Sequence, residues 1–215
     1  MRTTAQESGE WVGGFLFVGN RPILDFLNTR LVLSQVPTEL LTDFDALERW
    51  FIASGIVNSL KTRRRLRSWH NLPEAAVFLK ELLAFRERLR DAVLRIEAGK
   101  NPPGEFVKEV NARLLDHPPR TALRERNGQI SRETVFEPQT LADLWAPFVD
   151  GAADLLTESG TRRIRQCESC VVHFYDTSKK GSRRWCSMNI CGNKIKVAAY
   201  QRRKRYGNEV RRHSA

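Results

Sequence analysis

The sequence predicts a mostly α-helical fold with one small β-hairpin, an α+β arrangement, followed by a compact cysteine-bearing module. Apolar residues recur at helical spacing through much of residues 22–157. One Asn-Gly pair, Asn127-Gly128, separates two segments of partly alternating polarity, which is a strong hairpin signal. All four cysteines lie between Cys167 and Cys191. A chain of 215 residues with 41% hydrophobic content is long enough for one sizeable core and a small appended unit.

Helix start and stop signals divide the body into segments. Asn20 and Thr42 are candidate N-caps, and Pro73 suits the first turn of the longest helix, for which Gly99 supplies a stop. The segment at 58–71 is short and basic. We expect helices at about 22–32, 42–55, 58–71, 73–98, 104–115 and 141–157.

The period of the apolar residues changes once within the body. Residues 121–138 contain the predicted hairpin, and the helical period returns at 141–157. Pro147 and Gly151 are expected to bend that last helix.

The positive charge of the chain is confined to its last quarter. Residues 161–215 hold 15 Lys/Arg against 3 Asp/Glu, a net charge of +12, whereas residues 1–160 hold 21 against 22, a net of −1. We therefore expect a neutral helical domain over 1–160, a basic cysteine module over 161–206, and a flexible basic tail over 207–215. Such asymmetry is typical of a protein that meets a polyanion with one end.

No run of eighteen apolar residues occurs, and the N-terminus lacks the layout of a signal peptide. The sequence therefore predicts a soluble, cytoplasmic protein with no membrane partner. In a reducing compartment, clustered cysteines are metal ligands or redox groups more often than disulfides.

The cysteine spacing is C-x2-C-x15-C-x4-C. Two thiolates of a CxxC knuckle can face one tetrahedral ion, and a second pair completes four ligands, so we expect one structural Zn²⁺. Iron could use the same thiolates. A redox dithiol is the weaker alternative, because a second pair accompanies the CxxC. His173 is expected to be a bystander on the exposed face of a strand. The predicted metal ligands are Cys167, Cys170, Cys186 and Cys191.

The residues between the cysteine pairs predict a hairpin, with a strand at 171–176, a turn at 177–182 and a return through "RRW" to Cys186. A helix is expected after Cys191, which gives a treble-clef-like finger. So small a unit needs metal to fold. Its expected core residues are Phe174, Trp185 and Val197.

Basic residues lie on both sides of the second cysteine pair, and they could neutralise several phosphates of a nucleic acid. Asn193 could also pair with an adenine edge. The alternative is a solvated basic helix or an unstructured tail. The candidate nucleic-acid-binding residues are Arg183, Arg184, Asn193, Lys194, Lys196, Arg202, Arg203, Lys204 and Arg205.

The same residues resemble the bacterial CGNR zinc-finger proteins. The resemblance rests on the two cysteine pairs, "DTS" at 176–178, "RRWCSM" at 183–188, and "CGNK" at 191–194 with Lys196. Lys194 stands where the family has its final Arg, so the charge is kept and the bidentate guanidinium is lost.

The body is similar to the ABATE domain that accompanies this finger. The similarity rests on "GNRPILDFLNTR" at 19–30, the long central helix, and the approach to the first cysteine at 147–167. It implies zinc binding and a role in stress-responsive transcription regulation, with duplex DNA as the expected partner. An RNA-binding or protein-interaction module is the alternative.

The body of a DNA-binding protein could sense a ligand or form a homodimer. Asp25 and Asn28, with Arg30 close by, could line a small-molecule site, although buried groups bonded to neighbouring backbone are the simpler interpretation. No Ser/His/Asp constellation, phosphate loop or HExxH motif occurs, so we expect no enzyme and name no catalytic residues.

Overall fold

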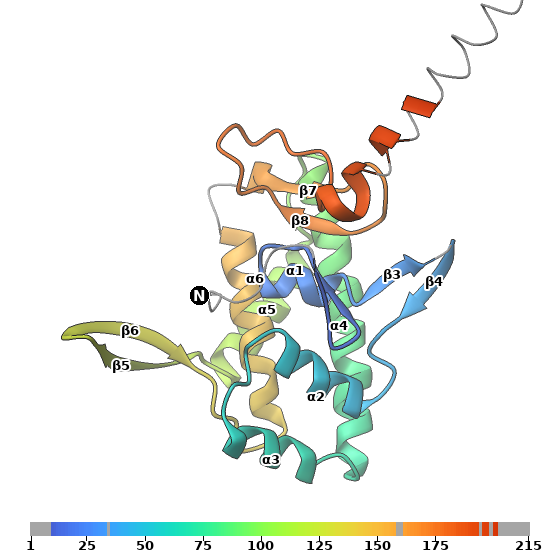
Figure 1. Ribbon diagram of the computed structural model, residues 1–215. Coiled ribbons are helices and arrows are strands. Elements are labelled where there is room, and N and C mark those ends of the chain that lie inside the picture. The colour runs from blue at the N-terminus through green and yellow to red at the C-terminus, as the bar shows by residue number, and fades with distance from the viewer. Residues whose placement is uncertain (1–9, 34, 158–160, 194, 198–199, 202–215) are drawn as a thin grey trace, which may run out of the picture.

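The computed structural model describes residues 10–33, 35–157, 161–193, 195–197 and 200–201. The fold is mostly helical, as the sequence predicts (Figure 1). The described residues form four small antiparallel strand pairs, whereas the sequence predicts only one hairpin in the body. The helices are α1 (Pro22–Leu27), α2 (Phe44–Ala53), α3 (Leu60–Ser68), α4 (Pro73–Glu97), α5 (Gly104–Asp116) and α6 (Ala146–Thr157). The paired strands are β1 (Glu10–Val12) with β2 (Phe15–Phe17), β3 (Arg30–Leu33) with β4 (Val36–Glu39), β5 (Arg120–Arg126) with β6 (Gln129–Val135), and β7 (Ile164–Gln166) with β8 (His173–Tyr175).

Local signals place the ends of α2 to α5 well. Pro73 opens α4, and Gly99, with φ of 71°, follows its end. The N-cap of α2 is Asp43 rather than Thr42, because an Asp43 carboxylate oxygen accepts the N–H of Ala46 at 2.7 Å. None of the described helices has the length and apolarity needed to cross a membrane.

The first helix is shorter than the sequence predicts. It ends at Leu27 instead of continuing to residue 32, and the chain turns into strand β3. Hydrogen bonds of Asn28 and Thr29 end the helix. The Thr29 hydroxyl donates to the Phe26 carbonyl at 2.6 Å, and the Asn28 side-chain amide bonds to the backbone of His173 in β8.

A partly buried ion pair fixes the β3–β4 hairpin to α4. The guanidinium of Arg86, almost fully buried, bonds both carboxylate oxygens of Glu39 at 2.8 and 2.5 Å and the Thr29 hydroxyl at 2.8 Å. The bidentate geometry compensates the cost of removing the charge from water.

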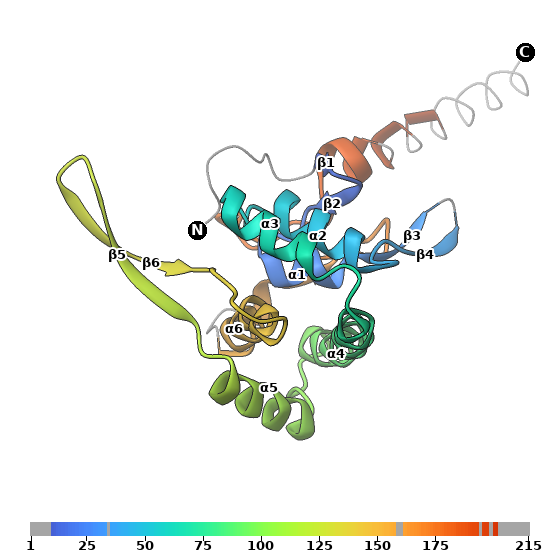
Figure 2. The same cartoon turned by 90° about the horizontal axis from the view of Figure 1, so that it is seen from below.

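The predicted Asn-Gly hairpin is confirmed. Asn127 and Gly128 adopt φ of 53° and 75° between β5 and β6, as a tight hairpin turn requires. Two views at right angles both show this hairpin projecting away from the helices (Figures 1 and 2).

The last helix of the body begins later than predicted. A short 3₁₀ turn occupies 142–145, and α6 begins at Ala146. Pro147 therefore lies in the first turn of α6, where proline is tolerated without bending the helix. Gly151 serves close packing instead, since a Cβ there would lie 3.0 Å from the Cβ of Ile23 in α1.

Among the described residues, two clusters of buried side chains form the core. The larger lies between α1, α2, α4 and α6 around rings with centroids 4.5 to 5.8 Å apart: Phe26, Trp50, Phe51 and Phe148. The smaller cluster combines residues from both ends of the chain: Leu16, Val18, Leu31, Cys167, Val172, Phe174, Cys186 and Cys191. The N-terminal strands therefore complete the core of the cysteine module.

Candidate metal centre and nucleic-acid surface

The first cysteine pair lies in the connection between β7 and β8. Strand β8 pairs antiparallel with β7, and Ile164 lies opposite Tyr175. The sequence predicts instead that this strand pairs with the "RRW" segment. The backbone N–H of Cys167 donates to the Val172 carbonyl at 2.9 Å and closes the knuckle. Strand β7 precedes the CxxC and strand β8 follows it, so the connection between these two paired strands carries both sulfurs.

The second pair lies at the start of a helical segment. A wide helical turn spans Met188–Gly192, and the described residues that follow to 201 are helical, so the helix begins before Cys191 rather than after it. The Ser187 carbonyl accepts the N–H of Cys191 at 3.1 Å. Gly192 is packed tightly, since a Cβ there would lie 2.6 Å from the Met188 sulfur and 3.3 Å from the Trp185 ring.

All four sulfurs converge on one point. Their Sγ atoms lie within 4.8 Å of one another, with 3.7 Å between Cys170 and Cys186 and 3.6 Å between Cys186 and Cys191. Tetrahedral zinc with Zn–S bonds of about 2.3 Å separates its sulfurs by about 3.8 Å. Three of the cysteines are buried and Cys170 is half-buried, so the residues fit a closed Zn²⁺ site.

The thiols of this cluster ionise unequally. Hydrogen bonds from the thiols of Cys170 and Cys186 hold the pKa of Cys167 far below its ordinary value. Donating to Cys167 raises the pKa of Cys170 to about 12 and raises that of Cys186 as well. One thiolate is thus stabilised by its neighbours, and a dication must displace the remaining protons when it binds.

The "DTS" segment holds the turn that leads to the second cysteine pair. The Asp176 carboxylate accepts the N–H groups of Ser178 and Arg183, both at 2.8 Å. Burial opposes ionisation of Asp176, but these hydrogen bonds outweigh it and lower its pKa. The ionised carboxylate therefore fixes the path of residues 176–183.

Comparison with protein families gives two matches. Residues 163–204 match the CGNR zinc finger, and residues 20–159 match ABATE, described as "Putative stress-induced transcription regulator". The chain belongs to the ABATE family. A search of curated proteins finds no match. The CGNR finger of this ABATE protein is a structural zinc site, and the four clustered cysteines are the residues that would hold the ion.

Two of the predicted nucleic-acid contacts have intramolecular partners. Arg183 donates from Nε to the Trp185 carbonyl at 2.8 Å and from its other nitrogen to the Cys186 carbonyl, and its guanidinium lies 4.7 Å from the centre of the Phe174 ring. Arg184 makes a bidentate ion pair with Glu168 at 2.5 to 2.8 Å. Arg183 therefore supports the CGNR finger from within, and the charge of Arg184 is neutralised.

The remaining candidates divide into exposed and undescribed residues. Asn193 and Lys196 are exposed on the helical segment, whereas Lys194 and Arg202 to Arg205 lie outside the described residues. Lys179 and Lys180 are exposed in the turn after "DTS", and they are not among the residues singled out from the sequence. Asp176 is a residue type that closes turns, so the two lysines shortly after it could have been predicted to lie in an exposed turn. Val197, expected in the core, is 54% exposed, whereas Phe174 is buried.

The "GNRPILDFLN" segment of the ABATE domain contacts the finger directly. Strand β8 has one edge on β7, and its other edge faces this segment. The Gly19 carbonyl accepts the Tyr175 N–H at 2.8 Å, and the Asn20 amide donates to the Tyr175 carbonyl at 2.8 Å. The Asn28 amide donates to the His173 carbonyl at 2.8 Å and accepts the His173 N–H at 2.9 Å. The segment thus takes the place of a third strand.

The three predicted ligand-binding residues, Asp25, Asn28 and Arg30, each bond to other parts of the chain. Asp25 is buried and accepts the Gly19 N–H at 2.6 Å, and Asn28 is bonded to β8. Arg30 lies in β3, where it forms an ion pair with Glu87 at 3.3 Å. Asp25 therefore holds the conformation of residues 19–28, and Asn28 holds that segment against β8.

His173 is outside the cysteine cluster but is not exposed, contrary to expectation. It is 1% exposed, and its Nδ1 lies 3.1 Å from a carboxylate oxygen of Glu97, the last residue of α4. The finger is thereby tied to α4 as well as to α1.

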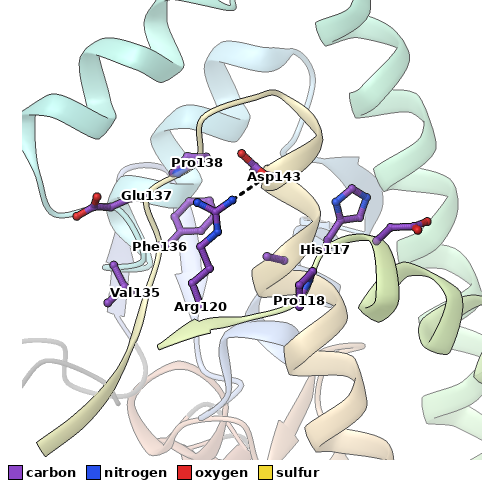
Figure 3. Close-up of a pocket in the computed structure, with 10 residues that line it drawn as sticks. His117, Pro118, Arg120, Val135, Phe136, Glu137, Pro138 and Asp143 are labelled. Carbon is purple, nitrogen blue, oxygen red and sulfur yellow. Dashed lines mark ion pairs between the residues drawn. The ribbon is translucent and has the colours of Figure 1, made fainter. Parts of the chain in front are cut away.

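A small recess of about 80 Å³ lies at the foot of the β5–β6 hairpin (Figure 3). His117, Arg120, Phe136 and Asp143 are among its lining residues, and the Arg120 guanidinium points toward Asp143 at 3.8 Å. Ligand pockets usually enclose about 300 Å³ or more, so this recess is too small for most small-molecule effectors.

Proposed function

We propose that this protein is a zinc-dependent, DNA-binding regulator of transcription in the bacterial cytoplasm. One observation carries the proposal: four thiolates converge beside a basic helical segment, so a structural metal fixes that segment. The family description names transcription regulation and stress. With four thiolates bound, zinc has no open coordination position, which favours a structural rather than a catalytic role.

The proposed contact surface follows from the exposure of the basic residues. Lys179, Lys180 and Lys196 are exposed cations, and Asn193 is exposed on the same helical segment as Lys196. We retain Lys194 and Arg202 to Arg205 as proposed phosphate contacts from the sequence alone. Arg183 and Arg184 contribute less directly, because internal partners use their guanidinium groups. Lysine contacts to phosphates give affinity without base readout.

Fluorescence anisotropy with labelled duplex DNA, measured over a series of salt concentrations, tests this proposal on the full zinc-loaded chain. The triple variant Lys179→Gln/Lys180→Gln/Lys196→Gln should bind less tightly, and its salt slope should be smaller by up to about 3. The matched control removes three exposed lysines of the body, Lys80, Lys100 and Lys108. Equal losses for the two triple variants would refute a binding surface on the finger.

Two alternative partners are separated by the same assay. Competition by structured RNA more strongly than by duplex DNA would assign the surface to RNA. Absence of salt-dependent binding to either would favour a protein-interaction finger. Small-molecule binding by Asp25, Asn28 and Arg30 stays a prediction, and the intramolecular bonds of these residues favour docking instead.

A further inference from the structure

The β5–β6 hairpin exposes apolar side chains that nothing in the described chain covers. Leu123 is 71% exposed and Ile130 is 72% exposed. The hairpin projects from the helices in both views, with only its foot against the body (Figures 1 and 2). Two-stranded hairpins are only marginally stable without a packing partner. A hairpin of seven residues per strand with uncovered apolar residues therefore suits a contact with another molecule.

The strand register determines which side chains share a face. Leu123 is opposite Arg132, and Glu125 is opposite Ile130, on the same face of the hairpin. These four residues form a square patch, which we call the arm patch. Leu123 and Ile130 occupy one diagonal, and the opposite charges of Glu125 and Arg132 occupy the other. Among the described residues, neither charge has an ion-pair partner.

The arm patch is complementary to itself about one particular two-fold axis. If the axis runs along the Leu123–Ile130 diagonal, a second patch placed face to face brings apolar residues against apolar residues. The same rotation brings Glu125 of each copy opposite Arg132 of the other. An axis along the other diagonal would place Glu125 against Glu125 and Arg132 against Arg132. Charge therefore selects the first arrangement, in which the hairpins cross steeply, as in orthogonal sheet packing.

We propose that the arm patch is a homodimer contact, occupied by the same patch of a second copy of this chain. The contact deepens the homodimer expectation that accompanies the proposed function, and it needs no nucleic acid. A contact made by two hairpins is small compared with the roughly 1,200 Å² of stable interfaces, so the dimer is expected to be weak. Its dissociation constant should be about micromolar or weaker.

Sedimentation velocity of the full zinc-loaded chain without nucleic acid, from about 1 µM to about 1 mM, tests the proposal. The chain should change from monomer to dimer over this range. Ile130→Asp should weaken dimerisation at least about tenfold. Ser131→Asp is the matched control, because it adds the same charge at the next residue on the opposite face and should leave dimerisation unchanged. A chain that is monomeric throughout would overturn the proposal.

A charge-reversal pair tests the contact between copies without disturbing the apolar residues. Glu125→Arg and Arg132→Glu should each dimerise poorly alone, because like charges then face each other. An equimolar mixture of the two variants should form heterodimers, since every facing charge pair is again opposite. Failure of the mixture to associate would overturn the proposal, even if the wild-type chain forms dimers. DNA binding is measured separately, so either proposal can fail alone.

Discussion

Asn28 of the ABATE domain and His173 of the CGNR finger are joined by two hydrogen bonds, which use both the donor and the acceptor of the Asn28 amide. The amide thus continues the β7–β8 sheet from the side of α1. Both groups are buried, with exposed fractions of 1%. Since buried polar backbone must be satisfied, this contact fixes the position of the finger relative to the body.

Replacing Asn28 with alanine should lower the free energy of unfolding by at least about 2 kcal/mol, because the N–H and carbonyl of His173 would lose their partners. Chemical denaturation of the zinc-loaded full chain measures the change. Asn101→Ala, at an exposed position, is the control and should have little effect. An Asn28→Ala chain as stable as the wild type would contradict the docking role.

Gly19→Ala should be destabilised by about 1–3 kcal/mol, because the added Cβ would lie 2.8 Å from the Asp25 backbone nitrogen and from the Leu24 Cβ. Relief of this clash would move the Gly19 carbonyl, which accepts the Tyr175 N–H. Gly104→Ala, where the Cβ meets nothing within 4 Å, is the matched control in thermal unfolding. If both variants melt at the same temperature, the close approach at Gly19 is not required.

Arg183→Ala should release zinc to a competing chelator faster than the wild type. The Arg183 guanidinium bonds the carbonyls of Trp185 and of Cys186, which is itself a proposed metal ligand. Arg184→Ala should release zinc at nearly the wild-type rate, since its ion pair with Glu168 is exposed and such pairs contribute little. A colorimetric zinc assay compares the two. The reverse order would show that Arg184, not Arg183, supports the centre.

The features that could be predicted from sequence are those with local signals. Pro73 and Gly99 delimit α4, Asn127 and Gly128 specify a turn, and the spacing of the cysteines specifies four ligands. Each signal depends on residues that are close together in the chain.

The features that were missed depend on contacts that no local sequence pattern marks. The end of α1 depends on Asn28, which bonds a strand 145 residues away, and β8 pairs with β7 rather than with the following segment. The bonds from the Arg183 guanidinium to two nearby carbonyls could also not be predicted from the sequence, because many conformations of a long side chain are open to it. Net charge identifies a basic module, but only the folded structure separates paired cations from free ones.

The four thiolates of the finger are expected to hold one zinc ion, and native mass spectrometry of the full chain, purified under reducing conditions, measures that ion. The intact chain should be heavier than the metal-free chain by one zinc ion. Cys186→Ser, which removes a buried ligand, should lose most of the bound metal. A chain that carries no metal, or a Cys186→Ser chain that retains its full zinc content, would show that these thiolates do not hold a structural zinc ion.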